Sequence, residues 1–487
     1  MAVTMSAGFS QNSGQLDFSN EKYTPQTLTC EGKTFNIRAY EKIVYVRNPV
    51  DTTYQQMNIY IPEAYFKEGF INGYTAETAP VFFPNKIGGY MPALPATTSD
   101  QTMRMRPQRN PPGTGSNTER PLTVVLALSR GYVVASAGAR GRTTKDNNGI
   151  YTGKAPAGIV DLKAAVRYLK FNDKKMPGDA NRIISNGTSA GGAMSTLLGA
   201  TGNNPDYEPY LKALGAAEAA DDVFAVSAYC PITNLDHSDM AYEWQFNGVN
   251  TLRKGGFMAK DNAPASVLSE EQINLSKQLK DMFPTYLNSL KVKDMQGNLL
   301  TLGSDGNGNF KELVKSYVKA SAQKALGNSS DLSSFTFLTI TNGKVTDLDF
   351  DAYINYMGRQ KSPPAFDALD LSTPENMLFG NTQTNLQHFT DFASTHSTVN
   401  AALAGKTIVK MMNPMYYIGQ ANTNTAKHWR IRHGTRDKDT GLAIPVMLAT
   451  LLQNKGFNVS LELPWEIPHS GDYDPDELFQ WIDGICK

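Results

Sequence analysis

Residues 182–193 carry the feature that most restricts the fold: a β-branched segment that runs directly into a Gly-x-Ser-x-Gly turn. Ile183 and Ile184 belong to the apolar segment, the turn spans residues 187–191, and the small residues that follow favour a helix. The two glycines permit a tight backbone that lifts the hydroxyl of Ser189 to the rim of a parallel sheet. Ser189 is therefore a candidate nucleophile. The alternative is an ordinary glycine-rich turn at a strand end.

A serine nucleophile needs a histidine base, and in this arrangement the base comes late in the chain. All six histidines follow Ser189, and His469 is the best placed of them. It follows the alternating segment 459–463 and lies in the polar loop 468–472, where the last strand would deliver a side chain to the carboxyl edge of the sheet. We interpret His433 as a hydrogen-bonding residue at a strand end and His428 as a residue at the surface or at the start of a strand.

The acid that orients the histidine is expected in the loop after the strand that contains residues 429–433. Asp437 and Asp439 both lie in this loop, and spacing alone does not choose between them. Asp472 and Asp474 are too close along the chain to orient His469, so we interpret them as loop and helix-cap residues.

The oxyanion of an acyl-transfer intermediate needs two backbone N–H groups. One is expected from Ala190, the residue after the nucleophile. The short apolar strand 81–83 leads to a Gly-Gly turn, in which Gly89 is the candidate for the second donor. The alternative is a glycine pair that only forms a turn.

The wider pattern predicts an α/β fold. Alternating stretches before residue 75 suit antiparallel leading strands. Apolar strands then alternate with helical segments at 122–128 and 158–170, which indicates a parallel sheet covered on both faces. Residues 231–415 form an insertion with expected helices at 270–290 and 310–326. We interpret it as a lid domain over the site, and residues 1–230 and 416–487 as the main domain.

Composition argues against several classes of partner. The chain has 46 basic and 46 acidic residues, so we expect no nucleic-acid partner and no membrane partner. The basic cluster Met103–Arg109 is interpreted as a solvated loop. The three cysteines, Cys30, Cys230 and Cys486, show neither disulfide nor zinc spacing. Cys230 is interpreted as a small buried hydrophobic residue, and we expect no metal and a monomer.

The first eight residues lack the basic and apolar regions of a signal peptide. We therefore expect a cytoplasmic protein, unless a leader has been removed from this sequence. The acidic loop 305–309 only partly matches a calcium-binding loop, because Phe310 stands where glycine is required, so a turn is expected.

With these residues placed, the chain from about residue 35 resembles bacterial tannases (tannin acyl hydrolases) of the lactobacillus type. These are α/β-hydrolases with a large lid. Six segments carry the resemblance: Asn186–Ala193, Ser227–Pro231, Met240–Gly248, Thr373–Asn376, His428–Gly434 and Pro468–Asp474. Fungal tannases differ in having cysteines beside the nucleophile and the catalytic histidine, where this chain has Thr188 and Pro468. Residues 1–35 are a terminal extension that the resemblance does not cover.

The resemblance implies an α/β-hydrolase fold and a serine esterase that releases gallic acid from galloyl esters without a cofactor. By motif it assigns the catalytic triad to Ser189, Asp437 and His469, and the oxyanion hole to Gly89 and Ala190. It also assigns three residues to the phenolic hydroxyls of the substrate: Lys361, Glu375 and Asp439. The alternative roles are a solvated lid lysine for Lys361 and a helix cap for Glu375.

Rival functions remain at this stage. A feruloyl or general carboxylesterase on the same scaffold is the nearest. A serine peptidase and a catalytically inactive binding module are more distant.

Overall fold

The computed structural model describes residues 16–99, 122–252 and 266–487. The first fifteen residues and the cluster Met103–Arg109 lie outside the described ranges. In the described part of the chain no helix has the length and apolar character needed to cross a membrane.

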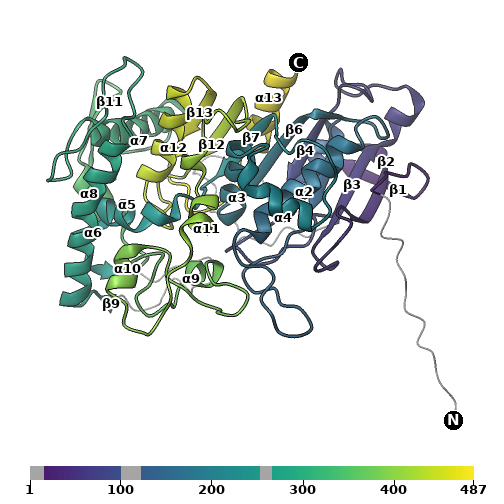
Figure 1. Cartoon of the computed structure of the whole chain (residues 1–487). Helices are drawn as coiled ribbons and strands as arrows, with labels where there is room; N and C mark the ends of the chain where they lie inside the picture. The colour runs from purple at the N-terminus through teal and green to yellow at the C-terminus, as the bar shows by residue number, and fades with distance from the viewer. Residues whose placement is uncertain (1–15, 100–121, 253–265) are drawn as a thin grey trace, which may run out of the picture.

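A nine-stranded sheet organises the described residues, in the order β1-β2-β3-β5-β4-β6-β7-β12-β13 (Figure 1). The first strands pair antiparallel, and every pairing from β5 to β13 is parallel, which confirms the predicted α/β fold with antiparallel leading strands. The strands are β1 (Thr24–Cys30), β2 (Lys33–Val44), β3 (Gln56–Pro62), β4 (Pro80–Pro84), β5 (Val133–Ala137), β6 (Asp179–Thr188), β7 (Ala225–Tyr229), β12 (His428–Arg432) and β13 (Asn458–Glu462).

The helices that follow these strands in the chain are α1 (Thr123–Ser129), α2 (Ala157–Phe171), α3 (Ala190–Ala200), α4 (Glu208–Ala213), α12 (Ala443–Asn454) and α13 (Pro475–Cys486). Phe479 of α13 packs its ring against Phe82 of β4. Gly199 of α3 lies directly against Val226 of β7. In the register, Phe82 and Ala225 point to the same side of the sheet, so Val226 points to the other. Helices therefore cover both faces, as expected for buried parallel strands.

Between β7 and β12 the chain forms a mostly helical region, which lies beside the sheet (Figure 1). The predicted helices at 270–290 and 310–326 are confirmed as α6 (Glu270–Ser289) and α7 (Asn309–Gly327). The other elements are α5 (Leu235–Phe246), β8 (Thr251–Leu252), β9 (Ser266–Val267), β10 (Leu338–Thr341), β11 (Lys344–Leu348), α8 (Phe350–Met357), α9 (Pro374–Leu378), α10 (Asp391–Thr395) and α11 (Lys406–Met411).

The inserted region shares one hydrophobic core with the sheet domain. Trp244 of α5 packs its ring against Phe283 of α6, Phe310 of α7 and Phe350 of α8. These side chains belong to the same cluster of buried residues as the apolar strands. Packing of these large rings holds the inserted helices α5, α6, α7 and α8 together. The acidic loop forms a turn as predicted, since Asp305 accepts hydrogen bonds from the backbone and side chain of Asn307.

Candidate active site

The turn between β6 and α3 has the sharp geometry that the sequence predicts. Ser189 has φ 61° and ψ −122°, and it immediately precedes the first residue of α3. A Cβ atom on Gly187 would lie 2.3 Å from the carbonyl oxygen of Gly191, so the turn closes only with glycine at that position. The N–H of Ser189 donates to the carbonyl oxygen of Tyr229 at the end of β7. The strained backbone thus holds the Ser189 side chain at the rim of the sheet, partly exposed.

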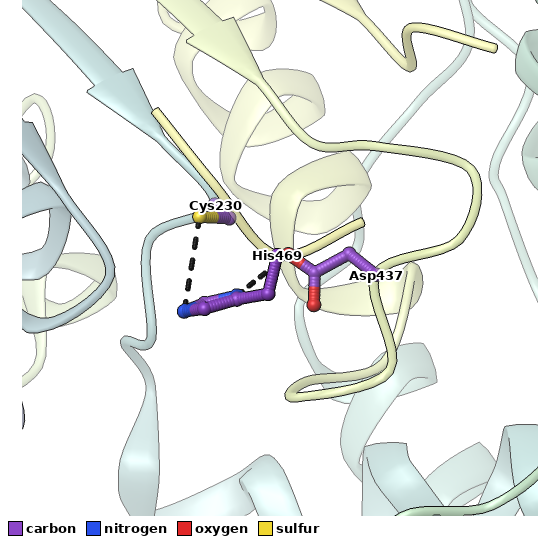
Figure 2. Close-up of side chains that lie close together, drawn as sticks. All are labelled: Cys230, Asp437 and His469. Carbon is purple, nitrogen blue, oxygen red and sulfur yellow. Dashed lines mark hydrogen bonds and ion pairs between the residues drawn. The ribbon is translucent and has the colours of Figure 1, made fainter. Parts of the chain in front are cut away.

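The loops after β12 and β13 bring an acid and a histidine together beside this turn. His469 Nδ1 lies 2.7 Å from Asp437 Oδ2, and Asp437 is fully buried. Figure 2 shows the imidazole with the carboxylate on its Nδ1 side. A Cβ on Gly471 would lie 1.8 Å from Thr188 Oγ1, so the histidine loop packs directly against the residue before Ser189.

Electrostatics link the acid and the histidine. Burial alone would raise the pKa of the Asp437 carboxyl, but the facing imidazoles of His469 and His433 and the hydrogen bond to His469 lower it to about 2. Burial is the largest single influence on His469 and would lower its pKa, but the charges and hydrogen bonds of Asp437 and Cys230 together outweigh it and hold that pKa well above its ordinary value. The pair is therefore an ionised carboxylate that stabilises an imidazolium, as a proton-accepting base requires.

Asp439 lies in the same loop and is the more distant of the two aspartates from the histidine. Its Oδ2 lies 3.7 Å from His469 Nδ1, one ångström farther than the oxygen of Asp437. Its other oxygen accepts a hydrogen bond from Gln360 Nε2 at 2.8 Å. Its backbone N–H donates to Asp437 Oδ1, which connects the two acids. The geometry therefore favours Asp437 as the partner of His469 and leaves Asp439 facing the inserted region.

The second nitrogen of the histidine faces a residue that the sequence reasoning did not connect with the site. Cys230 Sγ lies 3.9 Å from His469 Nε2 (Figure 2). Cys230 is buried, as the sequence predicts, but it does not belong to a strand, because β7 ends at Tyr229 and Cys230 has φ 37°. Within the described residues, His469 Nε2 makes no hydrogen bond to Ser189 Oγ. Catalytic hydrogen bonds are often long without substrate and shorten in the reacting complex.

Gly89 and Ala190 are the two predicted oxyanion donors. Ala190 is the first residue of α3, where backbone N–H groups have no partner within the helix. Gly89 has φ 54°, is exposed, and has open space where a side chain would stand. Arg142 Nε donates to the Gly89 carbonyl oxygen at 2.8 Å and fixes the orientation of that peptide. Asn85 Nδ2 ties the Gly89 loop to the nucleophile turn through the carbonyl oxygen of Gly191.

A second group of charged side chains lies beside the histidine pair. Glu375, in the first turn of α9, is 6% exposed, and burial raises the pKa of its carboxyl. Lys361 and Arg142 lower that pKa and Asp439 raises it, so these charges share one electrostatic environment. Lys361 Nζ lies 4.0 Å from the ring centroid of Phe366. Glu375 does not cap α9, because Thr373 occupies the N-cap position.

Lys154 connects the helix that carries Glu375 to the loop of the main domain that contains Arg142. Its Nζ donates to the carbonyl oxygens of Arg142 and Met377 at 2.8 Å and to both oxygens of Asn385. Met377 lies in α9, two residues after Glu375. The buried ammonium therefore joins the loop that supports Gly89 to the helix that presents Glu375.

Two interpretations of polar residues near the site need correction. His433 was expected to form hydrogen bonds at a strand end. Its backbone N–H does bond to Glu462, but both of its ring nitrogens are buried without a hydrogen-bond partner in the described part of the chain, and its Nδ1 lies 3.8 Å from Asp437 Oδ2. Asp474 occupies the N-cap position of α13, but its carboxylate pairs with Arg430 and does not cap the helix. The burial of β12 explains this pairing, since Arg430 needs a counter-charge there.

Solved structures identify the family. A tannin acyl hydrolase from Lactobacillus plantarum is 46% identical, with a TM-score of 0.90 over 97% of this chain and 99% of that chain. A tannase from Fusobacterium nucleatum is 48% identical, with a TM-score of 0.90 over 97% of this chain and 100% of that chain. The chain belongs to the tannase family.

Other matches agree with membership in the tannase family. A tannin acyl hydrolase structure in complex with ethyl gallate is 46% identical, with a TM-score of 0.89 over 97% of this chain and 99% of that chain. The family model BD-FAE, which describes α/β-hydrolases, matches residues 115–285. Esterase LipC of Mycobacterium tuberculosis is 43% identical over 56 residues, which are 12% of this chain and 14% of that protein.

Proposed function

We propose that this chain is a serine esterase that hydrolyses galloyl esters and releases gallic acid through an acyl-enzyme on Ser189. The observation that carries the proposal is the Asp437–His469 pair, with its 2.7 Å hydrogen bond, packed against the Ser189 turn. The ethyl gallate complex of a relative 46% identical to this chain supports the choice of substrate class.

Five residues supply the acyl-transfer chemistry in this proposal. His469 Nε2 accepts the proton of Ser189 Oγ as the oxygen attacks the ester carbonyl. The N–H groups of Gly89 and Ala190 stabilise the resulting oxyanion. His469 then donates its proton to the departing alcohol, and it next activates a water molecule that releases gallate from Ser189. The charge of Asp437 stabilises the imidazolium in both steps.

Substrate selection is assigned to Lys361, Glu375 and Asp439. Adjacent phenols donate hydrogen bonds to carboxylates and accept them from an ammonium, so two acids and a lysine match three neighbouring hydroxyls. A site whose buried polar groups depend on those hydroxyls penalises rings that lack them. Burial of Glu375 strengthens this penalty, because its carboxyl finds little water to replace a missing phenol.

Residues 231–415 are proposed to form the lid domain, and residues 1–230 and 416–487 the hydrolase domain. Support comes from Lys361 and Glu375, which the inserted region brings to the same electrostatic environment as Asp439 of the main domain. We further propose that the protein acts as a cytoplasmic monomer on small esters. Light scattering tests the monomer, and fractionation of the source cells tests the compartment.

The decisive experiment compares the wild type with Ser189→Ala on methyl gallate. We expect kcat to fall by at least about 10⁴-fold, as for loss of a triad nucleophile. Ser129→Ala is the matched control, because its hydroxyl donates to a local carbonyl at the end of α1. Retention of near-wild-type turnover by Ser189→Ala would exclude the mechanism.

The rival functions are separated by substrate. We expect methyl gallate to be hydrolysed with a higher kcat/KM than methyl ferulate or p-nitrophenyl acetate, and peptide amides to be left intact. A higher kcat/KM for methyl ferulate would instead assign the chain to feruloyl esters.

A further inference from the structure

The Cys230 thiol beside the catalytic histidine has no role in the proposed ester hydrolysis. Its sulfur lies 3.9 Å from His469 Nε2, the nitrogen that must accept the serine proton. The thiol is 1% exposed and donates to the carbonyl oxygen of Ser470 at 3.4 Å. Figure 2 shows the imidazole of His469 between Asp437, which faces one ring nitrogen, and Cys230, which lies beside the other.

This pair has the donor atoms and the spacing of a soft-metal chelate. Zn²⁺ binds thiolate sulfur at about 2.3 Å and imidazole nitrogen at about 2.0 Å, so it bridges donors up to about 4.3 Å apart. That limit applies to a linear arrangement, and tetrahedral coordination places the two donors about 3.5 Å apart, so the observed separation of 3.9 Å requires the side chains to approach by about 0.4 Å. Sulfur and imidazole ligands select zinc and related ions over Mg²⁺ or Ca²⁺, which prefer oxygen.

The surrounding contacts orient the imidazole of His469 for a metal and hold the backbone of Cys230 in place. Asp437 accepts the Nδ1 proton of His469, which leaves the Nε2 lone pair directed outward, as in the carboxylate–histidine–zinc arrangement of many metal sites. The backbone N–H of Cys230 donates to the Arg432 carbonyl oxygen at 2.6 Å and fixes the residue at the end of β7. Donor atoms of Cys230, Asp437 and His469 all lie within 4.8 Å of one another.

We propose that Cys230 and His469 form a chelating site for Zn²⁺, and that occupation of this site inhibits the enzyme reversibly. Zn²⁺ binds Sγ and Nε2, the protons of the thiol and of Nε2 pass to solvent, and water completes the coordination. With Nε2 held by the metal, His469 cannot accept the proton of Ser189. The inhibition, though not the binding, rests on the proposed esterase function.

The other cysteines provide matched controls. Cys30 at the end of β1 and Cys486 at the end of α13 are also buried as free thiols. Among the described residues, the cluster of potential metal ligands is Cys230, Asp437 and His469, and it contains neither Cys30 nor Cys486. Cys30→Ser and Cys486→Ser therefore remove a thiol without removing a proposed ligand.

The first experiment measures binding without reference to activity. Metal-free wild type is titrated with Co²⁺, and absorption from thiolate-to-cobalt charge transfer is recorded. We expect the band in the wild type and in both control variants, and its loss in Cys230→Ser and Cys230→Ala. Persistence of the band in the Cys230 variants, or its absence from the wild type, would overturn the proposal.

The second experiment titrates methyl gallate hydrolysis with Zn²⁺ in chelator-free buffer. We expect EDTA to reverse the inhibition and Mg²⁺ to have no effect. When each rate is normalised to that of the same protein without metal, we expect the half-inhibitory Zn²⁺ concentration of Cys230→Ser to be at least tenfold higher than that of the wild type. An equal half-inhibitory concentration in wild type and Cys230→Ser would contradict the inference. If the variants do not fold, anomalous scattering from a Zn²⁺-soaked wild-type crystal must place the ion between Sγ and Nε2; its absence there refutes the site.

The two proposals fail in different ways. An active wild type without a Co²⁺ band refutes the metal site alone. A wild type that binds Co²⁺ but does not hydrolyse any ester when metal-free refutes the esterase function alone.

Discussion

Two aspartates in one loop allow histidine orientation and substrate recognition to be tested separately. Asp437→Asn removes the carboxylate that lies 2.7 Å from His469 Nδ1. Asp439→Asn makes the same chemical change two residues later, at a side chain 3.7 Å from that nitrogen. Each variant replaces one carboxylate oxygen by an amide nitrogen, so the size of the side chain is nearly conserved.

The expected magnitudes follow from burial and charge. Asp437 is fully buried and its pKa is about 2, so its negative charge is present throughout the working pH range and directly compensates the imidazolium. An amide there favours the wrong histidine tautomer, and we expect kcat to fall by about 10⁴-fold for every ester. Asp439 is 23% exposed. Its loss removes a charged acceptor for one phenol, which is worth about 1.5–3 kcal/mol, or roughly 10–150-fold in kcat/KM.

The assay measures kcat and KM of both variants on methyl gallate and methyl benzoate. For Asp437→Asn we expect equal losses on the two esters. For Asp439→Asn we expect the loss on methyl gallate and little change on methyl benzoate. If Asp439→Asn abolished both activities while Asp437→Asn affected only the gallate, the two roles would be reversed and the reasoning from distance and burial refuted.

Three further predictions concern the loop that carries His469, the pKa of His469 and the buried Lys154. Gly471→Ala places a Cβ against Thr188 and so displaces the His469 loop. In steady-state assays we expect kcat to fall at least tenfold with little change in KM. An unchanged kcat would show that the loop adapts to the added methyl group. His469 must be neutral to act as the base, and its pKa is raised above the ordinary value of 6.5. We therefore expect kcat/KM to increase with pH and to reach its inflection above pH 6.5. An inflection below pH 6.5 would contradict the Asp437–His469 ion pair. Lys154→Met leaves the buried carbonyl oxygens of Arg142 and Met377 without their donor, so Tm should fall. We also expect KM for methyl gallate to rise more than KM for p-nitrophenyl acetate. Equal changes in the two KM values would show that Lys154 has only a structural role.

Much of the architecture could be predicted because it depends on local pattern. The β-branched run before Gly187 and the small residues after Ser189 define a strand, a turn and a helix within a dozen residues. Apolar strands alternating with helical segments indicate the parallel sheet for the same reason. Since parallel strands end at one edge, the loops of Asp437 and His469 were expected near Ser189, and the structure brings the acid, the histidine and the nucleophile turn together there.

The supporting residues could not be predicted, because their contacts join segments that are far apart in the sequence. Nothing in the neighbourhood of Lys154 or Arg142 distinguishes them from solvated basic residues; only the folded chain brings Met377 and Gly89 to them. Cys230 resembled a small hydrophobic residue because its strand is apolar. Its position one residue beyond that strand, next to His469, emerges from the register of neighbouring strands.

Stoichiometric labelling with an aryl fluorophosphonate tests the central claim most directly. This reagent phosphonylates a serine that a histidine has activated, and peptide mapping by mass spectrometry locates the adduct. We expect one adduct per chain on Ser189, loss of methyl gallate hydrolysis in proportion to labelling, and no adduct in Ser189→Ala. An adduct elsewhere, or a fully active wild type that resists labelling, would contradict an activated Ser189.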